Sequence, residues 1–244
     1  MSYLKFYVWL PLVLLVSACT DPEGKVIAKI PEASGISYCS SDDTLVVAND
    51  EGTYYKISRK GKILQQTKLG KYDLEGVVCE ESQMIFALED KGMLVVDRLT
   101  GEKKEIPLDT TYKGKKLPLF NKRSGVEGIT KVGNSVYLAR QSNKKKKSFI
   151  AVVRLMPYPS QIVDVLEHHV ADTAGLTYHD GYLYMVSDKE DLLIKYDLKK
   201  KKIVQKVTLE KGAWEGIAFD AKGFVYLADD DGRIVKYKKK RLGL

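Results

Sequence analysis

Five positions in the chain combine chemically useful residue types with a regular spacing. Each comes directly before a glycine that leads into an apolar segment: Ser34, Glu75, Glu127, Ala174 and Glu215. The glycines that follow them are 41, 52, 47 and 41 residues apart. Carboxylates held close together repel one another unless they take up protons or share a cation. Oxygen ligands with no His or Cys nearby suit a hard cation, Ca²⁺ before Mg²⁺.

A structural interpretation of the same Glu-Gly pairs stays open. They could mark the beginning of strands, with each carboxylate accepting hydrogen bonds from neighbouring backbone amides. Further acidic residues follow the apolar segments, and with one hydroxyl they form a set of candidate rim ligands: Ser34, Asp50, Asp188 and Asp230. Sequences such as Asp-Glu-Gly and Asp-Asp-Gly are also typical of simple turns.

The spacing predicts the elements that position these residues. Each anchor glycine is followed eight to ten residues later by a second apolar segment and then by an alternating strand. A period near 40 to 50 residues is typical of four-stranded propeller blades. The sequence therefore predicts an all-β fold, a five-bladed β-propeller. The expected first strands begin at the five anchors, near 35–39, 76–80, 128–132, 175–179 and 216–219.

The two ends of the chain complement each other. The fifth repeat has only three expected strands, near 216–219, 223–229 and 232–238, while a lone strand precedes the first repeat. Because an open array would leave a sheet edge in water, residues 25–30 are expected to pair with 232–238 and close the ring. In a propeller, the segments that lead into the first strands open on the same face as the turns between second and third strands. The three glutamates are therefore expected at one mouth of the channel.

The first residues resemble an export signal. Lys5 precedes an apolar stretch from Phe6 to Val16, and Val16-Ser17-Ala18-Cys19 resembles a bacterial lipobox. This implies a signal peptide over 1–18, lipidation (palmitate) at Cys19, a tether over 19–23 and a propeller domain over 24–244. An ordinary signal peptide with an incidental cysteine is the alternative. The expected location is the cell envelope, on the periplasmic or surface face of the outer membrane.

The chain is basic, with a formal net charge of +8. Its lysine runs at 144–147, 199–202 and 238–241 are typical of solvated turns, with attraction to an anionic surface as the alternative. The segment 109–125 is a basic insertion, either functional or flexible. The export signal disfavours a nucleic-acid partner, and a monomer is expected.

Two cysteines remain in the expected domain, Cys39 and Cys79. They follow their anchor glycines by four and three residues, which places their registers one residue apart. That offset favours side chains on opposite faces and two buried free thiols. A disulfide between them is the alternative.

The motifs Ala-Ser-Gly-Ile at 33–36 and Asp-Leu-Glu-Gly at 73–76, with the other Glu-Gly anchors and the leader, resemble the SdiA-regulated family of bacterial envelope proteins, distantly similar to NHL-repeat propellers. The resemblance implies a five-bladed propeller with a bound calcium ion. It places the metal on Glu75, Glu127 and Glu215. Ser34 and Ala174 break the glutamate pattern, so carbonyl groups or water would complete the coordination.

Two functions follow from these observations, and a passive scaffold that holds only a structural metal is a third possibility. The first is a binding module whose calcium-bearing mouth recognises an envelope ligand or protein. The alternative is a Ca²⁺-dependent hydrolase of lactones or phosphoesters in the same mouth. Its general base would be Asp50, Asp188 or Asp230. The sequence contains no Gly-x-Ser-x-Gly, His-Glu-x-x-His or Cys-x-x-Cys motif, which favours the binding module.

Overall fold

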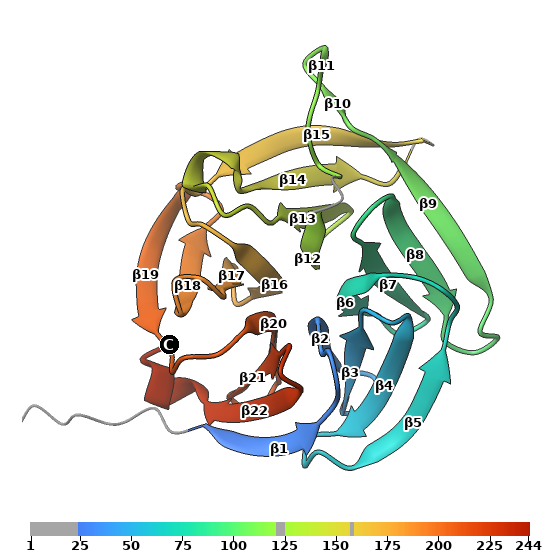
Figure 1. The fold of residues 1–244 in the computed structure, drawn as a ribbon, viewed down its shortest axis with the longest axis vertical. Helices are drawn as coiled ribbons and strands as arrows, with labels where there is room; N and C mark the ends of the chain where they lie inside the picture. The colour runs from blue at the N-terminus through green and yellow to red at the C-terminus, as the bar shows by residue number, and fades with distance from the viewer. Residues whose placement is uncertain (1–23, 121–124, 157–158) are drawn as a thin grey trace, which may run out of the picture.

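The innermost strands form a closed ring around a central axis (Figure 1). The computed structural model describes residues 24–120, 125–156 and 159–244. Each inner strand packs against the inner strand of the next blade, and the last packs against the first. These inner strands are β2 (Gly35–Cys39), β6 (Leu74–Cys79), β12 (Val126–Val132), β16 (Thr173–His179) and β20 (Trp214–Phe219). The all-β propeller predicted from the repeat spacing is confirmed.

Each inner strand begins an antiparallel unit of four strands. The second and third strands are largely buried between neighbouring blades, whereas the outermost strands alternate or are exposed. The first two blades continue with β3 (Thr44–Asn49), β4 (Thr53–Ser58) and β5 (Ile63–Lys68), and with β7 (Gln83–Leu88), β8 (Gly92–Asp97) and β9 (Lys103–Asp109). The next two continue with β13 (Ser135–Arg140), β14 (Phe149–Arg154) and β15 (Ser160–Glu167), and with β17 (Tyr182–Ser187), β18 (Leu192–Asp197) and β19 (Lys202–Thr208).

The last blade combines both ends of the chain. After β20 come β21 (Phe224–Asp229) and β22 (Arg233–Lys238), and β1 (Lys25–Lys29) supplies the outermost strand. β1 is antiparallel to β22, with Lys25 opposite Lys236 and Lys29 opposite Arg233. The predicted closure of the ring by the N-terminal strand is therefore observed.

The anchor glycines lie where neighbouring inner strands touch. A Cβ atom added at Gly35 would come within 2.6 Å of the Cα atom of Gly76, and one at Gly175 within 2.9 Å of the Cα atom of Gly216. At Gly128 it would come within 2.1 Å of the carbonyl oxygen of Ala174. No side chain fits at these distances. The repeated glycine is therefore a requirement of packing at the axis.

The two cysteines form a disulfide that joins the first two blades, with a Cα–Cα distance of 5.2 Å. The expectation of free thiols is wrong because it applied a rule for one sheet to two sheets that face each other. Gly35 and Gly76 lie side by side, so the two strands start level. Two facing sheets make contact through side chains that point toward each other, which lie on opposite faces of their own strands. Because successive residues of a strand point to opposite faces, the one-residue offset between Cys39 and Cys79 lets their side chains meet.

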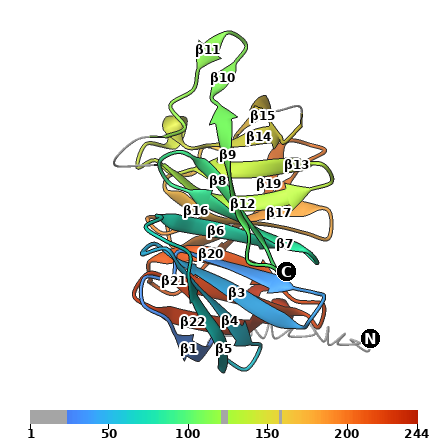
Figure 2. The same ribbon diagram turned by 90° about the vertical axis from the view of Figure 1, so that its right-hand side faces the viewer.

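The insertion after β9 is largely folded. It forms a hairpin of β10 (Thr111–Tyr112) and β11 (Lys115–Lys116) that projects from the ring (Figure 2). The hydroxyl of Tyr112 donates to Asp164 of β15 at 3.4 Å, and Leu119 is fully buried. Within the described ranges, no helix is long and apolar enough to span a bilayer.

Candidate functional site

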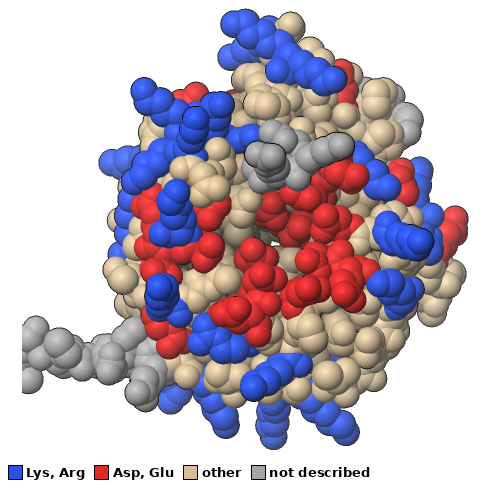
Figure 3. Space-filling view, in the orientation of Figure 1, with Lys and Arg blue, Asp and Glu red and all other residues tan. Residues whose placement is uncertain are grey.

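Acidic side chains surround the opening of the channel on one face, while lysines and arginines lie mainly toward the periphery (Figure 3). They come from three kinds of segment that meet on this face. The inner strands contribute Glu75, Glu127 and Glu215; the segments ahead of them Glu32, Asp73 and Asp172; and the turns after the second strands Asp50, Glu89, Asp188 and Asp230. This acidic mouth stands out on a protein of net positive charge.

Local backbone irregularities direct the inner glutamates. The pairing of first and second strands shifts register between Leu74 and Val77, between Val126 and Gly128, and between Trp214 and Gly216. A β-bulge takes a residue out of the regular ladder and changes the direction of its side chain. Glu75, Glu127 and Glu215 all lie inside these shifts, which explains how glutamates at strand positions meet near the axis.

Glu75 and Glu127 form a buried carboxyl pair. They are 6% and 7% exposed, and the Glu75 carboxyl donates a hydrogen bond to Glu127. Burial, followed by the charges of Glu127 and Glu215, raises the pKa of Glu75 well above its usual value. Burial also raises the pKa of Glu127, although a backbone amide at Gly125 stabilises its charged form. The raised pKa of Glu75 favours the protonated form, in which this carboxyl can donate a hydrogen bond to Glu127.

Glu215 connects the inner carboxyls to the rim. Burial raises its pKa to about 9, and the charge of Glu127 adds to this effect. The next contributions come from Asp230, Asp188 and Asp50, which are the acidic rim residues selected from the sequence. The structure thus brings the inner glutamates and these rim aspartates into one electrostatic group.

The two interrupted anchor positions leave gaps in this group. The Ser34 hydroxyl donates to the carbonyl oxygen of Leu74 at 2.6 Å, so it fastens the first blade to the second. Ala174 has no polar side chain, and its carbonyl oxygen faces Gly128. Ser34, selected as a rim ligand, therefore has a structural role in this arrangement.

The sequence pattern alone did not identify several acidic residues of the mouth as site residues. Glu32, Asp73 and Asp172 each lie three residues before an anchor glycine, a second repeat signal that could have identified them. Glu89, in the turn after β7, shares a hydrogen bond with Asp73. Burial and the charge of Glu127 raise the pKa of Glu89 to about 7.

The donor chemistry of the mouth suits a hard cation. None of Glu75, Glu127 and Glu215 forms an ion pair with a lysine or arginine in the described part of the chain. The buried Oδ1 atoms of Asn49 and Asp50 find no hydrogen-bond partner there either. Unsatisfied oxygens beside uncompensated carboxyls are the donors that Ca²⁺ accepts.

The positions of these carboxyl groups are a separate question from their chemistry. Among the described residues, no three His, Cys, Asp or Glu side chains are grouped closely enough to hold a metal ion as they stand. The carboxyls instead pair with one another, as Glu75 does with Glu127 and Glu89 with Asp73. The residues therefore fit calcium in their chemistry, and coordination would require these pairs to separate and turn toward one point.

The histidines take no part in this group. His168 is buried, and its Nδ1 accepts a hydrogen bond from the amide of Val170 at 3.3 Å. Burial lowers the pKa of His168 to about 4, so it is neutral at physiological pH. His169 is exposed, and His179 stacks on Phe219 at 4.5 Å.

Fold and mouth together define a β-propeller with an acidic channel opening. The family model described as SdiA-regulated matches residues 18–236, and the chain belongs to this family. A search of curated proteins finds no significant match.

Solved structures resemble the chain in fold. A glutaminyl cyclase from Myxococcus xanthus superimposes with a TM-score of 0.64 at 13% identity, covering 88% of this chain and 93% of that one. BamB from Moraxella catarrhalis gives a TM-score of 0.45 at 11% identity, covering 84% of this chain and 57% of that one. At such low identity, the first likeness supports the propeller fold alone, and the second carries no weight.

Proposed function

We propose that this chain is a lipid-anchored propeller of the bacterial cell envelope whose acidic mouth binds Ca²⁺ and there recognises a ligand or protein. One observation supports the proposal: Glu75, Glu127 and Glu215 lie together near the axis, and none of them forms an ion pair with a cationic side chain of the described residues. The leader sequence supports the anchor. Cys19 and the tether over 19–23 lie outside the described residues, so this part rests on the sequence.

In this proposal the inner glutamates supply the charge that holds the ion. Asp50, Asp188 and Asp230 lie around Glu215 and add negative charge at the rim. The inner-strand positions of Ser34 and Ala174 themselves offer no carboxylate, so coordination positions next to them are left for water or for an oxygen of the ligand. A bound Ca²⁺ would supply a positive centre that attracts a carboxylate, phosphate or carbonyl oxygen.

Thermal unfolding tests the proposal. Residues 20–244 would be melted in EDTA and then in millimolar Ca²⁺ or Mg²⁺. An ion that binds only the folded state raises the midpoint of unfolding. At a free ion concentration of a hundred times the dissociation constant, it adds about 2.7 kcal/mol to the free energy of unfolding. We expect a calcium-selective rise that is lost in Glu75→Gln, Glu127→Gln and Glu215→Gln. Glu102→Gln, on the exposed turn after β8, is the matched control and keeps the rise. No rise in the parent chain contradicts the proposal.

A Ca²⁺-dependent hydrolase is the second candidate, and Glu89 favours it. A carboxyl with a pKa of about 7 is divided between its acid and base forms near neutral pH, as a general acid or base requires. Turnover of lactones or phosphomonoesters that is abolished by EDTA and by Glu127→Gln would support this candidate. A binding module shows no turnover on such a panel and keeps its calcium response.

A further inference from the structure

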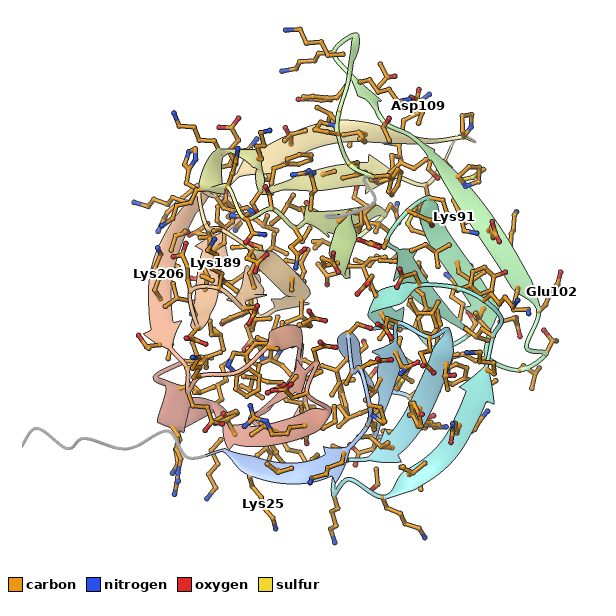
Figure 4. The ribbon with its side chains drawn as sticks, viewed as in Figure 1. Lys25, Lys91, Glu102, Asp109, Lys189 and Lys206 are labelled. Carbon is orange, nitrogen blue, oxygen red and sulfur yellow. A yellow bond between two sulfur atoms is a disulfide. The ribbon has the colours of Figure 1, made fainter. Side chains whose placement is uncertain are left out.

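A second charged surface lies between the first and last blades, away from the acidic mouth. It is a groove of about 470 Å³ between β1, the turn after β4 and the end of β22. Six basic residues line this basic groove: Lys25, Arg59, Lys60, Lys236, Lys238 and Arg241. Lys25 projects from β1 at the outer edge of the ring (Figure 4). Ile27 and Phe224 also line the groove, so its character is both cationic and hydrophobic.

Most of these charges have no acidic partner. Only Arg59 forms ion pairs, with Asp43 and Asp220, among the groove residues within the described ranges. The ammonium of Lys236 lies 4.0 Å from the centre of the Phe224 ring and donates to the carbonyl oxygen of Arg59 at 3.2 Å. Burial and the charge of Arg59 lower the pKa of Lys236. Five of the six basic side chains thus form no ion pair within the described fold, and the groove has a net positive charge.

Exposed apolar side chains adjoin the groove. Ile63 and Leu64 begin β5 and are 48% and 49% exposed. Their strand starts two residues after Gly61, which lies directly against the backbone of Ile27 in β1. Basic residues beside exposed aliphatic ones are typical of surfaces that rest at the headgroup level of a bilayer. A site for free phosphate would not require the exposed aliphatic side chains of Ile63 and Leu64.

Chain topology places the groove on the side opposite the mouth. The mouth is formed by turns between second and third strands, whereas the groove is lined from the turn after β4 and the end of β22, at the other ends of the blades. β1 runs from this opposite side toward the mouth, since Lys25 pairs with Lys236 and Lys29 with Arg233. The chain therefore joins the fold at residue 24, beside the groove.

We propose that the basic groove docks the domain on an anionic lipid bilayer, with headgroup phosphates in the groove and the acidic mouth directed away from the membrane. The proximity of a bilayer rests on the proposed anchoring at Cys19, while the affinity of the groove for anionic lipid does not. Four residues lie between Cys19 and residue 24, and the five Cα–Cα steps span at most about 18 Å. Anionic headgroups are then the phosphates within reach of the groove.

Vesicle binding tests the proposal with residues 20–244, which contain all the described strands but carry no lipid. Vesicles of phosphatidylcholine alone are compared with vesicles containing about a third phosphatidylglycerol, at physiological ionic strength. The groove variant is Lys60→Gln, Lys238→Gln, Arg241→Gln. A matched control removes three exposed lysines of another blade: Lys144→Gln, Lys146→Gln, Lys147→Gln.

We expect the parent chain to bind only the anionic vesicles. Each basic residue near an anionic surface is worth about fivefold in affinity, so the groove variant should bind about a hundredfold more weakly. The control should stay within about twofold of the parent, and all three proteins should melt at the same temperature.

Three results would overturn the docking surface. They are the absence of binding to anionic vesicles, an equal loss in both triple variants, and binding of inorganic phosphate to the groove by a chain that ignores vesicles. The last result would identify a small-anion site instead. The calcium response of the same preparations is measured separately, so failure at the groove and failure at the mouth are distinguished.

Discussion

The stability of the metal-free protein should fall as pH rises from about 5.5 to 8. The pKa of Glu215 is about 9 in the folded chain against 4.5 as a free side chain. A carboxyl whose pKa is raised by folding contributes its full stability below the unfolded pKa and loses it as pH rises toward the folded pKa. Between these values each pH unit costs about 1.4 kcal/mol per proton, which gives about 3 kcal/mol over the window.

Other groups modify this figure in known directions. The pKa of Glu75 is also raised, so its contribution has the same sign. His168 acts in the opposite direction, because its folded pKa of about 4 makes the low-pH side less stable by about 1 kcal/mol. The pKa of Asp220 is lowered, so its contribution is already complete above pH 4 and does not change in this window.

Glu215→Gln isolates the effect. The amide keeps the shape of the side chain and cannot ionise. The contribution of His168 to the pH dependence of stability is the same in both proteins and cancels in the comparison. In EDTA the variant should gain about 3 kcal/mol on the parent between pH 5.5 and 8, or about 6 to 12 °C in midpoint. It should also lose the calcium response. Parallel pH curves for parent and variant in EDTA would refute the assignment of a buried, uncompensated carboxyl.

Three further predictions concern the ring. Deleting residues 24–31 removes β1 and should lower the melting temperature of the whole domain in one transition; a truncated chain that melts like the parent contradicts closure by β1. Gly76→Ala brings a Cβ atom within 2.7 Å of the Ile129 amide nitrogen and should cost about 1 to 3 kcal/mol or more in chemical unfolding, and an unchanged midpoint would argue against the axial contact. Reducing the Cys39–Cys79 disulfide, which closes a separation of 40 residues, should cost about 4 kcal/mol on the chain-entropy model, while free thiols in the untreated protein would exclude the bond.

Most of the fold could be predicted from the sequence because the patterns that indicate it are local and repeated. The anchor glycines recur where inner strands touch, and a short strand before the first anchor matches a missing strand after the last. Each of these signals depends on neighbours along the chain or on the closure of one ring. The strand positions expected from them agree with the structure to within two residues, as for β2, β21 and β22.

The site was readable only in part, since its properties arise between blades. The three glutamates and the rim aspartates were selected from their positions, yet the pairing of Glu75 with Glu127 depends on bulges that leave no mark in residue type. The disulfide required the relative orientation of two facing sheets. The basic groove joins residues from both ends of the chain, which no local pattern brings together.

Isothermal titration of Ca²⁺ into the EDTA-treated, dialysed chain at pH 7 tests the central claim most directly. Repeating it in two buffers of different ionisation enthalpy counts the protons released. We predict one calcium ion per chain and release of at least one proton, because Glu215, with a pKa of about 9, is protonated at pH 7 before the ion binds. The raised pKa of Glu75 acts in the same direction. Glu127→Gln should abolish the heat and Glu102→Gln should retain it. Absence of saturable calcium heat, or binding unaffected by Glu127→Gln, would contradict a calcium site at the acidic mouth.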